Sequence, residues 1–228
     1  MEIQQIYGIL HRTYGPQGWW PLSKGKLQTK HHNGPPKDDH DRWEIITGAL
    51  LTQNTSWTNV EKAIENLNKA KLLSIDKIIK TDVKKIAELI RPAGYYNQKA
   101  ERLKIIAGFF SAHFRNKTIP SREEILKVKG IGPETADSIL LYTFEQPYFV
   151  VDAYTRRIFS RLGLIKKDAS YDEIQRFFME NLSKQDKKKT IDTYKEYHAL
   201  IVELAKRNCR TRPVCEGCIL SDLCNKKR

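Results

Sequence analysis

Apolar residues recur along this chain with the spacing of one face of an α-helix. Two stripes are complete, the first formed by Trp43, Ile46, Leu50 and Leu51 and the second by Val60, Ala63, Ile64 and Leu67. Side chains three and four residues apart lie on the same side of a helix, so each stripe can pack against a core. Thr58 and Glu61 have the spacing of a capping box, which predicts that the second helix starts near Thr58.

The same periodicity continues along the chain. Ile86, Leu89 and Ile90 form a third stripe, which ends before Pro92 and Gly94. Further helices are predicted at about 97–113, 133–144, 153–164, 171–182 and about 187–207. The apolar run 148–151 is too short to found a sheet, and strand-like alternation is scarce elsewhere. We therefore predict an all-α fold, with irregular structure at 15–36 and in the last twenty residues.

Composition and charge narrow the choice of partner. The 228 residues suffice for one large domain or two small ones, and 40 Lys and Arg against 27 Asp and Glu give a net charge of +13. Such an excess favours a polyanionic partner, most often nucleic acid, over a merely lysine-rich surface. The first residues lack the features of a signal peptide, and no apolar run approaches the roughly 20 residues of a membrane helix. We expect a cytoplasmic protein without a membrane partner.

All four cysteines lie in the last twenty residues, with the spacing C-x5-C-x2-C-x5-C. They are Cys209, Cys215, Cys218 and Cys224. The loops between them are short and polar, so the four thiolates can surround one metal centre. Structural zinc usually has two close cysteine pairs, whereas only the middle pair is close here. The pattern favours a [4Fe-4S] cluster, with structural zinc as the alternative, and fits a reducing compartment.

Residues 126–140, LKVKGIGPETADSIL, predict two helices joined by a turn. Pro133 suits the first position of a helix, and Gly130 and Gly132 can take positive φ and let a ligand reach the backbone. Turn amides beside a helix N-terminus form a binding site for a phosphate, and Lys127 and Lys129 add positive charge there. The sequence therefore predicts a phosphate-binding hairpin, with an ordinary tight turn as the alternative.

Asp152 follows the apolar run 149–151 and precedes a predicted helix in the segment VVDAYTRR. This position is typical of a helix N-cap. A second hypothesis is a functional carboxylate at the mouth of a cleft, kept ionised by the helix N-terminus and by Arg156 or Arg157. One residue can serve both purposes.

In this order, the GIG hairpin, VDAYTRR and the cysteine tail resemble the helix-hairpin-helix DNA glycosylases of the endonuclease III type. The resemblance implies two helical domains with a DNA-binding cleft between them. It implies a six-helix barrel at 36–148 that carries the hairpin, and a second domain, 1–35 plus 149–228, with the cluster loop. It also implies that Asp152 is the catalytic aspartate and that the four cysteines are the cluster ligands, although the first cysteine gap is one residue shorter than the commoner pattern.

One departure from that family concerns its strand-cleaving members. They carry a lysine at the position of Glu134, and its amine forms a Schiff base with the sugar. A carboxylate cannot form an imine, so the resemblance implies an enzyme that hydrolyses the glycosidic bond without cleaving the strand.

The segments WWP (19–21), ALLTQNTSW (49–57), RPAGYYNQKAERL (91–103) and GIGPETAD are similar to the 3-methyladenine DNA glycosylases of the endonuclease III type. This implies removal of alkylated purines, such as 3-methyladenine and 7-methylguanine, from double-stranded DNA with a damaged base. The implied pocket residues are Trp19, Trp20, Pro21 and Trp57. Asn54, or else Gln53, would fill the gap left by the flipped base. Some members of this subgroup lack the cluster, so the cysteine tail is a departure from it.

Several alternatives stay open at this point. Gln53 and Asn54 could cap a helix, and the tryptophans could be core residues, as we expect of Trp43. His198 is interpreted as a packing residue, and His31, His32 and His40 as solvated. Rival functions are a glycosylase for uracil, mismatched thymine or oxidised bases, with or without weak lyase activity, and a non-catalytic DNA-binding protein. We expect a monomer of prokaryotic type, associated with the nucleoid.

Overall fold

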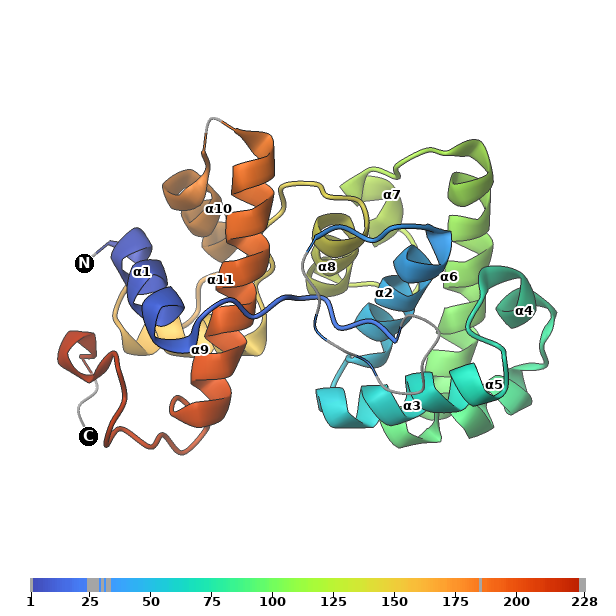
Figure 1. Cartoon of the computed structure of the whole chain (residues 1–228), viewed down its shortest axis with the longest axis horizontal. Coiled ribbons are helices and arrows are strands. Elements are labelled where there is room, and N and C mark those ends of the chain that lie inside the picture. The colour runs from blue at the N-terminus through green and yellow to red at the C-terminus, as the bar shows by residue number, and fades with distance from the viewer. Residues whose placement is uncertain (1, 24–28, 30, 32–33, 185, 226–228) are drawn as a thin grey trace. The chain divides into compact units, whose positions relative to one another are not determined.

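The computed structural model describes residues 2–23, 29, 31, 34–184 and 186–225, and these form an all-α fold (Figure 1). The α-helices are α1 Ile3–Tyr14, α2 Asp39–Leu51, α3 Trp57–Lys69, α4 Ile75–Lys80, α5 Val83–Leu89, α6 Tyr96–Asn116, α7 Arg122–Leu126, α8 Pro133–Thr143, α9 Ala153–Arg161, α10 Tyr171–Leu182 and α11 Lys187–Arg207. Two short 3-10 helices are η1 Arg91–Ala93 and η2 Ser221–Leu223. The predicted fold class is confirmed, with no strand among the residues described.

One predicted helix cap and one predicted helix end are wrong. The capping box at Thr58 does not form, because Ser56 takes the extended N-cap conformation and places Thr58 inside the first turn of α3. Capping boxes occur instead at the starts of α7 and α10, where Ser121 and Ser170 are the N-caps. Helix α9 ends earlier than predicted, since Gly163 has φ +76°, a left-handed conformation that favours glycine.

The chain divides into two compact units, each formed by its own segments. The terminal unit comprises Met1–Trp19 and Gln146–Arg228, and the central unit comprises Trp20–Glu145. This division differs from the sequence-based ranges, which placed residues 20–35 with the termini. Trp20 and Leu22 bury 95% or more of their surface within the central unit, where Ser23 also bonds to α2.

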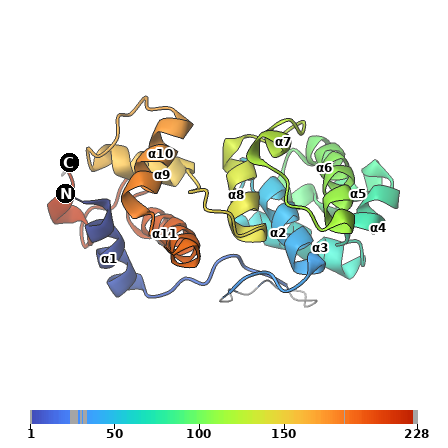
Figure 2. The ribbon, with the colours of Figure 1, turned by 90° about the horizontal axis from the view of Figure 1, so that it is seen from above.

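In the central unit, α2 packs against α3, α6 and α8 (Figures 1 and 2). Buried residues occupy all sides of α2, which explains why its sequence has only a partial apolar stripe. Trp43 is 1% exposed, which confirms it as a core residue. Glu44 is also buried and accepts hydrogen bonds from the amide and hydroxyl of Ser23, both at 2.6 Å. These bonds fasten residues 20–23 to α2.

In the terminal unit, α11 packs against α1, α9 and α10. Its core is an aromatic cluster in which Phe149 and Phe178 stack at 4.1 Å between ring centroids. Tyr197 joins the cluster, and its hydroxyl donates to the carbonyl of Ile3 at 2.9 Å. The apolar run before Asp152 is therefore a buried extended segment, which places the start of α9 against α11.

Candidate active site

Asp152 is the N-cap of α9, as one of the two sequence hypotheses predicts. Its Oδ1 accepts hydrogen bonds from the amide of Thr155 at 2.6 Å and from the Thr155 hydroxyl at 2.8 Å. Its Oδ2 lies 3.7 Å from Nε2 of His198, a residue of α11. The carboxylate therefore has one oxygen held by its own helix and the other beside a second helix.

The surroundings keep Asp152 ionised. The side chains of Asp152 and His198 are 11% and 7% exposed. Burial acts to raise the pKa of Asp152, but the hydrogen bond and charge of His198, with the two bonds from Thr155, hold that pKa below its usual range. The carboxylate is thus negatively charged at neutral pH.

The expected arginine partners of Asp152 are elsewhere. Arg156 donates to the carbonyl of Ala169, and Arg157 donates to the carbonyl of Cys209 at 2.8 Å. The expectation that one of them stabilises the carboxylate is therefore wrong, because both guanidinium groups are directed to carbonyl oxygens in other segments. His198 takes that place. It is buried as predicted, but its contact with Asp152 joins two helices far apart in sequence, and no local pattern signals it.

The predicted tryptophan pair is divided between the two units. Trp19 belongs to the terminal unit, where its ring meets the His198 ring edge-on at 5.7 Å. Trp20 belongs to the central unit, where its ring meets Trp57 at 5.3 Å and Tyr142 at 5.2 Å, both edge-on. Pro21 is buried beside Trp20 in sequence. Trp57, the first residue of α3, is half-buried.

The loop between α2 and α3 presents Asn54 to solvent. Asn54 is exposed and has φ +55°, a left-handed conformation that asparagine tolerates better than most residues. The Gln53 side chain is directed to the hairpin, where its Nε2 donates to the Gly130 carbonyl at 3.1 Å and to the Thr135 hydroxyl at 2.9 Å. Its Oε1 accepts from Arg102 at 3.2 Å. Of the two candidates for filling a vacated base position, only Asn54 has its side chain on the surface.

Lys99 is a buried residue that the sequence interpretation did not single out. It is 1% exposed, and its Nζ donates to the carbonyls of Leu51, Gln53 and Ala93 at 2.8, 2.7 and 2.8 Å. Burial, with the charge of Arg102, lowers its pKa to about 8. The signal for this role was its position four residues before Leu103, on the apolar face of α6.

The hairpin consists of α7, a turn and α8. Arg122 of α7 makes a bidentate ion pair with the buried Asp137 of α8, in which Nε and Nη2 donate to the two carboxylate oxygens at 2.8 and 3.1 Å. Gly130 has φ +90°, whereas Gly132 is extended at φ −98°, so positive φ holds for only one of the two predicted glycines. A Cβ on Gly130 would lie 2.5 Å from the Arg102 side chain, whereas a Cβ on Gly132 would have no protein atom within 4 Å.

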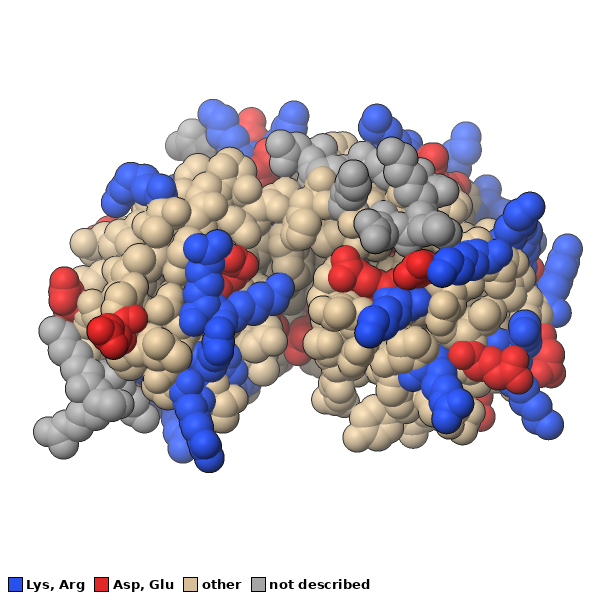
Figure 3. All heavy atoms as spheres, turned by 60° about the horizontal axis from the view of Figure 1, so that its bottom comes forward, with Lys and Arg blue, Asp and Glu red and all other residues tan. Residues whose placement is uncertain are grey.

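The predicted phosphate-binding residues of the hairpin are accessible. Lys127, Lys129 and Gly132 are exposed, and Glu134 is exposed in the first turn of α8. Lys and Arg side chains are scattered over the face shown in Figure 3, with acidic side chains between them. The surface charge is therefore spread along the chain, as its net charge of +13 suggests.

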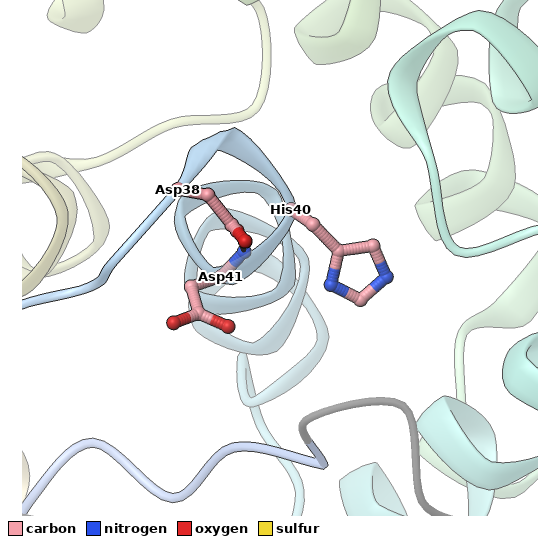
Figure 4. Close-up of side chains that lie close together, drawn as sticks. All are labelled: Asp38, His40 and Asp41. Carbon is pink, nitrogen blue, oxygen red and sulfur yellow. Dashed lines mark hydrogen bonds between the residues drawn. The ribbon is translucent and has the colours of Figure 1, made fainter.

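Asp38, His40 and Asp41 form a small polar group at the start of α2 (Figure 4), with their ligand atoms within 4.8 Å of one another. Asp38 caps α2 by accepting from the amide of Asp41 at 2.9 Å. Asp41 accepts from the amide of Lys37 at 3.0 Å. Helix capping accounts for both carboxylates, and His40 is exposed as expected.

The cysteine tail, residues 209–224, is attached to the C-terminal half of α9. Arg157 holds the carbonyl of Cys209, and Arg161 donates to Cys209 Sγ at 3.2 Å and to the carbonyls of Arg210 and Thr211 at 2.7 and 2.9 Å. Burial raises the pKa of Cys218, and the charges of the other three cysteines raise it further. The four sulfurs therefore lie within electrostatic reach of one another.

Comparison with known proteins identifies the class of the fold. The structure is similar to that of H. pylori 3-methyladenine DNA glycosylase (MagIII) bound to 1,N6-ethenoadenine, with a TM-score of 0.74 and 30% identity over 91% of this chain and 98% of that chain. It also has the fold of endonuclease III in a non-covalent DNA complex, with a TM-score of 0.77 and 22% identity over 98% of this chain and 94% of that chain. The architecture is that of a helix-hairpin-helix DNA glycosylase.

Sequence comparison places the chain in one family. Residues 47–184 match the HhH-GPD superfamily base excision DNA repair protein. The chain is also 45% identical over 234 residues to the "Putative DNA repair glycosylase" of Methanocaldococcus jannaschii, covering 99% of this chain and 96% of that protein. The chain belongs to the HhH-GPD superfamily and is a DNA glycosylase of base excision repair. Within the described residues, no helix is long and apolar enough to cross a membrane.

Proposed function

We propose that this protein is a monofunctional DNA glycosylase that removes alkylated purines from double-stranded DNA. The observation that carries the proposal is Asp152, a largely buried carboxylate held in the ionised state. Helix capping occupies its Oδ1, and Oδ2 is not used by the cap. This oxygen can stabilise positive charge that develops on a deoxyribose ring.

The chemistry follows from the bond that must break. The damaged base leaves the helical stack, at a cost of a few kcal/mol, and its N-glycosidic bond then breaks through an oxocarbenium-like sugar. The ionised Asp152 stabilises that cation and orients the attacking water. A purine alkylated on a ring nitrogen already carries positive charge, so it leaves without a strong acid. Selection then requires a pocket that attracts a cationic ring.

Aromatic side chains of the central unit support this choice of substrate. Trp57 is half-buried at the start of α3, and Trp20 supports it edge-on from within the core. Aromatic faces attract cationic rings through cation–π interaction. The similar H. pylori structure is that of a 3-methyladenine DNA glycosylase. We assign base stacking to Trp57 and the filling of the vacated base position to Asn54.

We propose that the enzyme has no lyase activity, because of the residue at one position of the hairpin. Glu134 occupies the position of the family's nucleophilic lysine, and it cannot form an imine. Lys99 has a pKa of about 8, which suits a nucleophile, but it is 1% exposed and bonded to three carbonyls. Lys127 and Lys129 are exposed beside the turn and are assigned, with Gly130 and Gly132, to DNA phosphates.

A [4Fe-4S] cluster is proposed for the cysteine tail. One zinc ion at about 2.3 Å from each sulfur would bring all four sulfurs within about 4 Å of one another. Among the described residues, no three of these sulfurs lie within 4.8 Å of one another. A cubane, whose irons each take one thiolate, fits such wider spacing. The cluster would be held by Cys209, Cys215, Cys218 and Cys224 and would stabilise the tail. Iron and sulfide analysis tests this, and one bound zinc in a colourless protein would refute it.

The activity is tested with a panel of duplexes that each carry one lesion. We expect abasic sites from 3-methyladenine and 7-methylguanine, with strand breaks only after alkali. Faster release of uracil, mismatched thymine or an oxidised base would overturn the substrate assignment. Strand breaks without alkali, at the rate of base release, would overturn the monofunctional assignment.

A further inference from the structure

The two oxygens of Asp152 have different partners, and only one is fixed by the helix cap. Thr155 donates twice to Oδ1, at 2.6 and 2.8 Å. Oδ2 lies 3.7 Å from Nε2 of His198. The torsion that turns a carboxylate is broad and soft, so a cap on one oxygen leaves the other able to move. A contact from α11 to Oδ2 removes that freedom.

The imidazole ring of His198 is itself held in place. His198 is 5% exposed on α11, and Trp19 contacts its ring edge-on, with 5.7 Å between centroids and 83° between planes. The chain before Trp19 is attached to the same helix, because the Gln17 amide donates to Oε1 of Glu196 at 2.8 Å. Glu196 and His198 thus fasten residues 17–19 to α11, all within the terminal unit.

Among the described residues, His198 is the titratable group that lies against the Asp152 carboxylate. From α9, Thr155 donates to the carboxylate through its amide and its hydroxyl. From α10, the Tyr171 hydroxyl accepts from the amide of Val151 at 3.4 Å. Arg156 and Arg157 bond to carbonyls in other segments.

We propose that His198 is a positioning residue for the reaction, which holds Oδ2 of Asp152 through Nε2, while Trp19 fixes the plane of the imidazole ring. The inference rests on the proposed function, because it assigns His198 to the carboxylate that acts on the sugar. It also gives Trp19 a task in the terminal unit that differs from stacking on the base. Reacting groups displaced by about 1 Å lose up to a hundredfold in rate, so orientation of this oxygen matters.

The test compares His198→Phe with His198→Gln. Phenylalanine keeps the aromatic contact with Trp19 but has no donor, whereas glutamine keeps an N–H donor near the position of Nε2. His113→Gln is the matched control, since His113 lies on α6 of the central unit with its own partner, Thr118, at 2.9 Å. Each full-length variant is measured in two ways: the pKa of Asp152 by carbon NMR without DNA, and single-turnover excision of 7-methylguanine.

We expect His198→Phe to raise the pKa of Asp152 and to slow excision by about ten- to a hundredfold, with duplex affinity unchanged. His198→Gln should recover part of both losses, and His113→Gln should change neither. An unchanged pKa of Asp152 in His198→Phe overturns the inference, whatever the excision rates show. Full excision in His198→Phe, with Asp152→Asn inactive, overturns it too. Full excision in Asp152→Asn overturns the proposed function instead. The NMR measurement of the Asp152 pKa is independent of catalysis, so it distinguishes this failure from a failure of the inference about His198.

Discussion

The terminal and central units hold their functional residues in different ways. In the terminal unit, Asp152 depends on a contact between side chains of α9 and α11. In the central unit, side chains hold the loop after α2 and the hairpin turn through backbone carbonyls: Lys99 donates to three carbonyls, and Gln53 donates to the carbonyl of Gly130. The terminal unit positions the negative charge of Asp152, whereas the central unit fixes the backbone of the loop after α2 and of the hairpin turn. Variants should therefore affect chemistry in the first unit and binding or selection in the second.

The largest expected effect is that of Asp152→Asn. Asparagine is also a good N-cap, so α9 should keep its start while the negative charge is removed. Electrostatic stabilisation of this kind is worth a few kcal/mol, and excision should fall by about two to three powers of ten. Single-turnover kinetics and duplex affinity are the measurements. Loss of folding in this variant would show that Asp152 is needed for structure rather than for chemistry.

Trp57→Ala tests selection in the central unit. Stacking contributes about 1–3 kcal/mol per base, so excision of methylated purines should slow by about ten- to a hundredfold. Affinity for undamaged duplex should barely change. The control is Trp43→Phe, whose effect should be on thermal stability, because Trp43 is 1% exposed. Equal losses with alkylated and undamaged duplexes would contradict the pocket assignment.

The two hairpin glycines should separate folding from DNA binding. Gly130→Ala introduces a Cβ 2.5 Å from Arg102 at φ +90°, which should destabilise the fold by about 1–3 kcal/mol. Gly132→Leu meets no protein atom near its Cβ, so the melting temperature should hold. It should instead weaken binding to all duplexes alike, because phosphate contacts carry no sequence information. A loss confined to damaged duplex would place Gly132 in the base pocket.

The titration of Lys99 should change the stability of the protein with pH. Its folded pKa of about 8 lies below the usual 10.5, so the unfolded chain binds more protons between these values. The free energy of unfolding should therefore gain, from this group, at most about 3 kcal/mol as the pH rises through that window. Urea unfolding of wild type and Lys99→Met at pH 7.5 and 10 measures this difference. The free energy of unfolding of wild type minus that of Lys99→Met should rise between these pH values. A fall would contradict the direction of the pKa shift.

Much of the fold could be predicted because its signals are local. Helical stripes, Pro133 and the paired glycines depend on residues a few positions apart, and these predicted the all-α fold and the hairpin between α7 and α8. The contact of Asp152 with His198 could not be predicted, since it depends on how α11 packs against α9. The separation of Trp19 from Trp20 was missed for the same reason: Trp19 contacts His198 in the terminal unit, whereas Trp20 contacts Trp57 in the central unit.

Helix α9 connects the carboxylate of Asp152 with the cysteine tail. Its nine residues span about 13 Å, with Asp152 before its first residue and with Arg157 and Arg161, which hold the cysteine tail, in its C-terminal half. Arg161 binds the tail through two carbonyls and one sulfur, so any rearrangement of the tail acts first on the last turn of this helix. The proposed cluster would therefore be fixed to the same helix whose first turn is capped by Asp152.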